Sequence, residues 1–86
     1  MLLNNKRKEI DKIDEELLNL FQERLVIVEE IKKYKVKNNL AIYDKAREDE
    51  ILKKIQSKYK DSNYFLQIET FIKTVIAISR DYQNEK

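Results

Sequence analysis

Residues 3–37 read LNNKRKEIDKIDEELLNLFQERLVIVEEIKKYKVK, a stretch with neither proline nor glycine and with apolar residues at a regular helical spacing. This pattern predicts one long helix. Alternating steps of four and three residues trace an inner seam along that helix, and a second apolar stripe runs beside the seam. The seam contains Leu3, Arg7, Ile10, Asp14, Leu17, Phe21, Arg24, Val28, Ile31 and Lys35, and the stripe contains Ile13, Leu20, Ile27 and Tyr34.

Three seam positions are basic, namely Arg7, Arg24 and Lys35. A cation on a packed face costs desolvation free energy unless an anion meets it, so these residues indicate a buried site for negative charge. Arg24 and Lys35 lie about 16 Å apart along the helix axis, whereas Arg7 lies about 26 Å from Arg24. If two copies of the helix pair antiparallel and cross near Leu17, Arg7 of one chain arrives beside the other two cations of its partner. We therefore expect a homodimer with two equivalent sites, each shared between subunits.

The first helix is expected to end near Lys37, because Asn38 and Asn39 can adopt the left-handed conformation that closes a helix. Asp44 then stands where an N-cap would start a second helix, which runs to about residue 59. Arg47 and Glu48 lie in the first turn of that helix.

A third helix is predicted after a turn at residues 60–63, and its apolar face continues into Ser79 and Gln83. The hydroxyl and amide groups of these two residues could point into the same cavity as the seam cations. We expect an all-α fold with three helices in a single domain over residues 1–86. Since a helix of about 50 Å is longer than so small a domain is wide, we expect an intertwined antiparallel homodimer, a six-helix bundle.

Composition excludes several classes of protein. Charged residues make up 40% of the chain but leave a net charge of only +2, so a broad nucleic-acid-binding surface is not expected. Cysteine and histidine are both absent, which excludes disulfides, thiolate chemistry and the usual general base, and we expect no metal and no cofactor. No run reaches the apolar length of a membrane span or of a signal peptide, so a cytoplasmic location is the default expectation.

The polar residues collected in this way suit a small dianionic ligand and a reaction in which charge develops on an oxygen without proton transfer. Their order and spacing resemble those of the all-helical class (type II) of chorismate mutases. The resemblance rests on residues 7–14 (RKEIDKID), Leu17-Leu18, Glu23-Arg24, Lys35, residues 44–48 (DKARE), Ile78-Ser79 and Gln83. It implies conversion of chorismate to prephenate in phenylalanine and tyrosine biosynthesis, by a Claisen-type rearrangement without a covalent intermediate.

The resemblance also implies roles for individual residues. Arg24 and Arg7 of the partner subunit would hold the two carboxylates of the substrate, while Lys35 and Gln83 would donate to the ether oxygen as the carbon–oxygen bond breaks. Glu48, with the backbone at Asp44, would bind the ring hydroxyl, Ser79 would assist in binding a carboxylate, and Arg47 would line the site. The apolar walls that hold the reactive conformer would be formed by Ile31, Ile51 and Ile76.

Two positions bear on how such an enzyme would behave. Ala41 stands where many relatives carry proline, so we expect a less rigid connection before the second helix. Gln83 is neutral, whereas some relatives carry a carboxylic acid that must be protonated to donate. We therefore expect activity without an acidic optimum.

Other interpretations compete with this one. Taken singly, Arg7 or Lys35 is more often a seam-edge cation that reaches out to water, and the chain could be a non-catalytic dimeric helical interaction module whose seam cations set register. Isochorismate-pyruvate lyases are similar in fold and site, although the set of Glu48, Arg47 and Gln83 favours the mutase. A membrane-binding amphipathic helix is excluded, because the cations lie within the apolar face and do not flank it.

Overall fold

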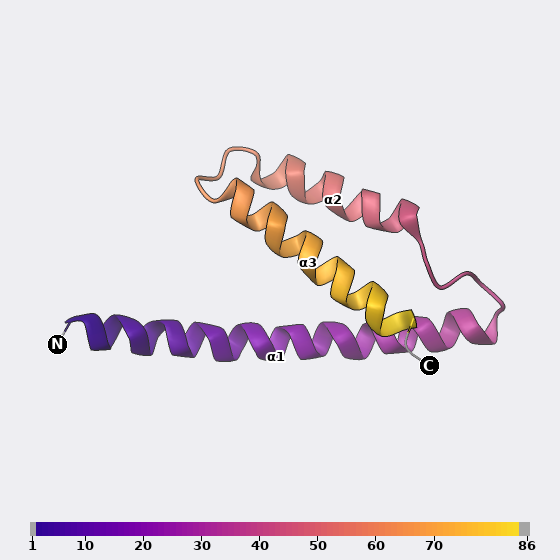
Figure 1. Cartoon of the computed structure of the whole chain (residues 1–86), viewed down its shortest axis with the longest axis horizontal. Helices are drawn as coiled ribbons and strands as arrows, with labels where there is room; N and C mark the ends of the chain where they lie inside the picture. The colour runs from indigo at the N-terminus through magenta and orange to yellow at the C-terminus, as the bar shows by residue number, and fades with distance from the viewer. Residues whose placement is uncertain (1, 85–86) are drawn as a thin grey trace.

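Three helices account for most of the chain (Figure 1). The computed structural model describes residues 2–84, which contain α1 (Leu2–Lys37), α2 (Lys45–Tyr59) and α3 (Phe65–Asn84), and no strand is found among them. The predicted all-α fold with a long first helix is therefore confirmed. None of these helices combines the length and the apolar character that a membrane span needs within residues 2–84.

The end of α1 is set by two asparagines. Asn39 has a positive φ of 56°, a conformation that asparagine tolerates better than most residues, and it reverses the chain after the last turn. The side-chain amide of Asn38 donates to the carbonyl of Tyr34 at 2.8 Å, and the amide N–H of Leu40 donates to the carbonyl of Lys35 at 2.8 Å. These bonds satisfy carbonyls that the helix end would otherwise leave unpaired.

Helix α2 begins at the predicted N-cap. The carboxylate of Asp44 accepts a hydrogen bond of 2.9 Å from the backbone N–H of Arg47. Helices α2 and α3 then form an antiparallel hairpin across the turn at residues 60–64 (Figure 1). A hydrogen bond of 2.8 Å from Gln56 to Glu69 joins the two helices near that turn.

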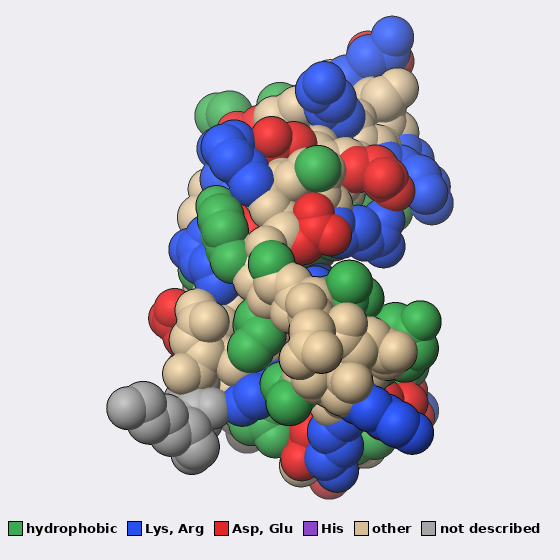
Figure 2. Space-filling view, turned by 90° about the vertical axis from the view of Figure 1, so that its right-hand side faces the viewer, with side chains coloured by type: hydrophobic (Ala, Val, Ile, Leu, Met, Phe, Trp, Pro, Cys, Tyr) green, Lys and Arg blue, Asp and Glu red, His purple; other side chains and the backbone are tan. Residues whose placement is uncertain are grey.

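The core lies where α3 crosses the C-terminal half of α1. The buried apolar residues there are Val28 on α1 and Val75 and Ile76 on α3. This is a small core for the chain, as expected for so few residues. On the surface seen in Figure 2, basic and acidic side chains are interspersed, in keeping with the small net charge of +2.

The N-terminal half of α1 extends beyond the hairpin (Figure 1). Every residue from position 2 to position 20 is exposed, and apolar side chains are no exception, with Ile13 at 60% and Leu20 at 62%. The subunit is accordingly elongated, with extents of 57 × 28 × 15 Å. These exposed apolar residues recur at the helical spacing of the predicted seam and stripe. As expected for a helix longer than the domain is wide, a single subunit leaves much of the apolar face of α1 exposed.

Candidate active site

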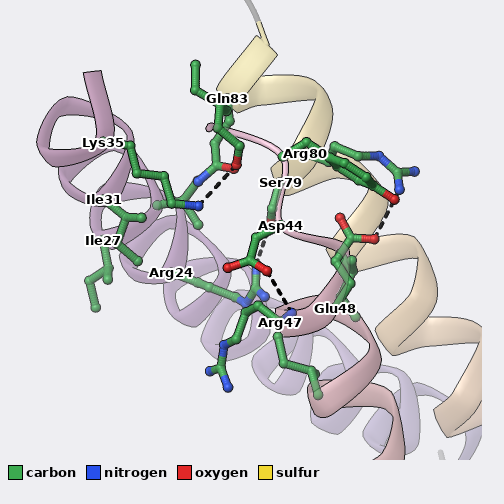
Figure 3. Close-up of a pocket in the computed structure, with 15 residues that line it drawn as sticks. Arg24, Ile27, Ile31, Lys35, Asp44, Arg47, Glu48, Ser79, Arg80 and Gln83 are labelled. Carbon is green, nitrogen blue, oxygen red and sulfur yellow. Dashed lines mark hydrogen bonds and ion pairs between the residues drawn. The ribbon is translucent and has the colours of Figure 1, made fainter. Parts of the chain in front are cut away.

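A cavity of about 260 Å³ opens where α1, the connection before α2, the first turn of α2 and the last turns of α3 meet (Figure 3). Every predicted site residue except Arg7 lines it. The cavity is lined by Arg24, Ile27, Val28, Ile31, Lys35, Ile42, Tyr43, Asp44, Arg47, Glu48, Ile51, Ile76, Ser79, Arg80 and Gln83. The three isoleucines predicted as apolar walls are among them.

Arg24 is held in place from α3. Its guanidinium donates to the hydroxyl of Ser79, which is buried and in turn donates to the carbonyl of Val75 at 2.9 Å. Burial lowers the pKa of Arg24 below its ordinary value, and the positive charge of Arg47 lowers that pKa further. The protein around Arg24 therefore disfavours its positive charge, and a bound anion would offset this effect.

Lys35 connects α1 to the segment before α2. Its ammonium group donates to the carbonyl of Ile42 at 3.0 Å, which leaves two of its three N–H donors for other partners. Gln83 comes from the last turn of α3 and lies on the same side of the cavity as Lys35 (Figure 3). One cationic donor, Lys35, and one uncharged donor, Gln83, are thus available at one end of the cavity.

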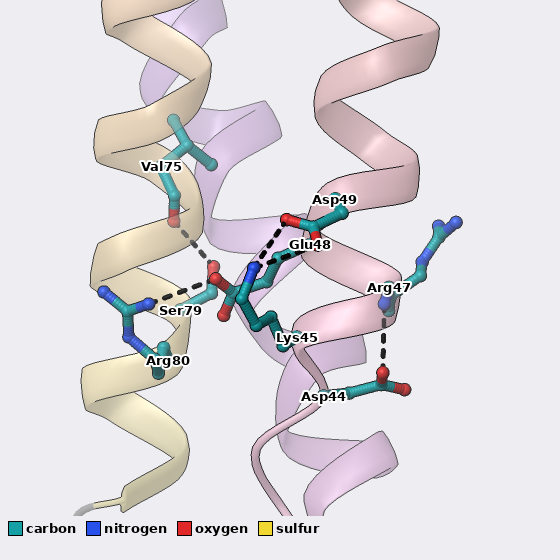
Figure 4. A network of polar contacts seen from close by, with 8 residues as sticks. All are labelled: Asp44, Lys45, Arg47, Glu48, Asp49, Val75, Ser79 and Arg80. Carbon is teal, nitrogen blue, oxygen red and sulfur yellow. Dashed lines mark hydrogen bonds and ion pairs between the residues drawn. The ribbon is translucent and has the colours of Figure 1, made fainter.

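The charged side chains at the start of α2 point in different directions. Asp44 is occupied as the helix cap. The guanidinium of Arg47 turns away from α3 (Figure 4). It pairs with Glu50 at 2.6 Å in a largely exposed ion pair. Glu48 instead faces α3, where the guanidinium of Arg80 donates to its carboxylate at 3.1 Å.

Sequence reasoning missed Arg80 and Tyr43. The guanidinium of Arg80 pairs with Glu48 and also lies 5.7 Å from the centre of the Tyr43 ring, a cation–π contact. A signal was present, since Arg80 follows Ile76 by four residues and precedes Gln83 by three, which places it on the face that was predicted to line the site.

Arg7 lies outside the cavity of its own subunit. It is exposed on the extended half of α1, about 26 Å along the axis from Arg24. No cluster of three or more acidic, histidine or cysteine side chains that could hold a metal ion occurs among residues 2–84.

Comparison with known proteins identifies the family of this chain. The family model described as chorismate mutase type II matches residues 6–84. A bifunctional chorismate mutase/prephenate dehydratase from Aquifex aeolicus (strain VF5) is 49% identical over 53 residues, which are 62% of this chain and 15% of that protein. This chain therefore matches only a small part of the length of that relative. No solved structure is similar enough to count as a match. Because the family match covers nearly the whole chain, from the first seam cation to the last turn of α3, this protein belongs to the chorismate mutase type II family.

Proposed function

We propose that this chain catalyses the rearrangement of chorismate to prephenate, and that it does so as an antiparallel homodimer. The observation that carries the proposal is the convergence on one cavity of fixed donors and cations from all three helices. The family of the chain and the name of its relative from Aquifex aeolicus support the same reaction.

The charge of the cavity fits a dianion. In one subunit, four basic and two acidic side chains line it, which gives a net charge of +2. The basic residues are Arg24, Lys35, Arg47 and Arg80, and the acidic residues are Asp44 and Glu48. Chorismate carries two carboxylates, so its charge is opposite in sign to that of the cavity. The lowered pKa of Arg24 agrees with the same match, because a neighbouring anion favours the charged form of arginine.

The reaction needs no proton transfer. The ether carbon–oxygen bond of chorismate breaks while a carbon–carbon bond forms within the same molecule, so no group leaves and the atoms of substrate and product balance. Negative charge develops on the ether oxygen, and Lys35 and Gln83 would donate hydrogen bonds to it. A preorganised donor of this kind lowers the barrier by up to about 3 to 4 kcal/mol.

The remaining side chains would orient the substrate. Arg24, fixed by Ser79, would bind one carboxylate, and Arg7 of the partner subunit would bind the other. Glu48 and the backbone at Asp44 would take the ring hydroxyl. The isoleucines of the wall would hold the compact conformer in which the reacting carbons are close, which reduces the entropic part of the barrier.

The dimer is proposed because one subunit supplies only part of such a site. If two α1 helices pair antiparallel about Leu17, Arg7 of the partner subunit falls opposite Ile27, about 5 Å along the axis from Arg24 and about 12 Å from Lys35. Ile27 lines the cavity, so the added guanidinium would arrive at its edge. The same pairing would cover the apolar residues that α1 exposes.

The experiment gives purified protein chorismate and isochorismate in parallel. We expect conversion of chorismate to prephenate, with losses of about 100-fold or more in kcat/KM for Arg24→Ala and for Lys35→Ala. Lys33→Ala is the matched control, because Lys33 is exposed on the same helix and pairs only loosely with Glu29, at 3.8 Å. No consumption of chorismate, or unchanged turnover in both site variants, would refute the proposal. Release of pyruvate from isochorismate, without consumption of chorismate, would instead indicate a lyase.

A further inference from the structure

Arg80 contacts two elements of the cavity wall at the same time. One of its guanidinium N–H groups donates to Oε1 of Glu48 at 3.1 Å, and its guanidinium carbon lies 5.7 Å from the centre of the Tyr43 ring. It thereby joins α3 to the first turn of α2 and to the connection before α2. Figure 4 shows the ion pair bridging the two helices.

This ion pair differs in kind from other ion pairs of the chain. Arg80 and Glu48 are 32 residues apart, on different helices, and their side chains are 37% and 20% exposed. Several pairs instead join residues three or four apart on the surface of a single helix, as for Lys6, Lys33, Lys45, Arg47 and Lys73. Such exposed pairs within one helix contribute little to structure. A partly shielded pair between two helices can orient a functional group.

Glu48 is the group that needs orientation. The side chain of glutamate rotates about three bonds, and ordering it when substrate binds costs conformational entropy. The bond from Arg80 occupies Oε1 and leaves Oε2 able to accept a hydrogen bond from a ligand. The cation–π contact with Tyr43 limits the motion of Arg80 itself. Glu48 is therefore held ready before any ligand arrives.

We propose that Arg80 is a positioning residue that fixes the Glu48 carboxylate for the ring hydroxyl of the substrate. The inference rests on the proposed function, since it assigns the free oxygen of Glu48 to that hydroxyl. Arg80 itself acts through Glu48 and need not touch the reacting atoms.

The test compares Arg80→Gln with Lys73→Gln. Lys73 lies seven residues earlier on α3, hence on nearly the same face, and its substitution also removes one positive charge and one ion pair, with Glu69 at 3.7 Å. It does not line the cavity. We expect Arg80→Gln to lower kcat/KM for chorismate about tenfold and Lys73→Gln to leave it unchanged. Arg80→Lys, which keeps the charge but not the planar stacking on Tyr43, should recover part of the loss.

Two further measurements separate positioning from general structural support. In a Glu48→Gln background, Arg80→Gln should cause no additional loss, because the group on which it acts is gone. With a chorismate analogue that lacks the ring hydroxyl, the effect of Arg80→Gln should likewise disappear. Losses that add in the double variant, or equal losses for both substrates, would overturn the proposal. Turnover of chorismate by the unaltered protein tests the proposed function separately, whatever these variants show.

Discussion

Mixing two inactive variants should restore activity if each site is shared between subunits. The variants are Arg7→Ala and Arg24→Ala, which remove cations about 26 Å apart on the same helix. In a homodimer of either variant both sites lack one arginine. In a mixed dimer one site takes its Arg24 from the first chain and its Arg7 from the second, so it is complete, while the other site lacks both.

The expected recovery follows from symmetry. Unfolding and refolding an equal mixture produces mixed dimers as about half of the population, and about half of the sites in those dimers are complete. Activity should therefore reach about one quarter of the value for the unaltered protein. Each parent variant should retain only about 0.1% to 1%, because a single charge-assisted contact in the transition state is worth a factor of about 100 to 1,000.

The assay is the initial rate of chorismate consumption at equal total protein, measured for each parent and for the refolded mixture. The control mixes Arg24→Ala with Lys35→Ala, two residues that line the cavity of the same subunit. That mixture contains no complete site and should stay at the level of its parents. Rates for the Arg7→Ala and Arg24→Ala mixture that merely average those of its parents would refute the shared site.

Three further predictions concern single substitutions. Arg24→Met should abolish most activity without lowering the melting temperature. Burial lowers the pKa of Arg24 in the folded state, so the positive charge of Arg24 opposes folding at every pH below that pKa. In the variant, the hydroxyl of Ser79 keeps its hydrogen bond to the carbonyl of Val75. Circular dichroism melts check this, and a large drop in melting temperature would contradict it. Gln83→Glu should convert a flat rate profile between about pH 6 and 8 into one that rises as pH falls, because only the protonated acid can donate to the ether oxygen. A flat profile for the variant would count against Gln83 as a donor. Asp44→Ala should cost about 1 kcal/mol of unfolding free energy in urea melts through loss of the N-cap, and Asp44→Asn should cost much less.

Local sequence patterns predicted the helices because each pattern acts over a single turn or along a single face. Asn39 closes α1 and Asp44 caps α2 through bonds to residues only a few positions away, so no knowledge of the tertiary structure was needed. The seam of α1 likewise indicated an unusually long apolar face, and the subunit exposes that face.

The candidate site was partly foreseeable. Cations placed within an apolar seam indicated a site for an anion, and the first turn of α2 and the polar end of the apolar face of α3 supplied further candidates. Resemblance to the chorismate mutases added the roles of these residues. The pairing of Glu48 with Arg80 and the outward turn of Arg47 toward Glu50 were not foreseeable. Arg47 and Glu48 are adjacent on α2, so their side chains leave the helix about 100° apart. The sequence does not say which of the two directions faces α3.

The sequence by itself determined which segments are helical, where they end and which faces are apolar, since hydrogen bonds between neighbouring residues and the helical repeat govern these properties. Only the tertiary structure decided which polar side chains meet residues of another element. The contact of Arg80 with Glu48 and Tyr43, and that of Lys35 with the carbonyl of Ile42, depend on the angle at which α3 crosses α1 and on the path of the connection before α2. The packing of α3 against both α1 and α2, with Val28, Val75 and Ile76 buried, brings together residues that are far apart along the chain.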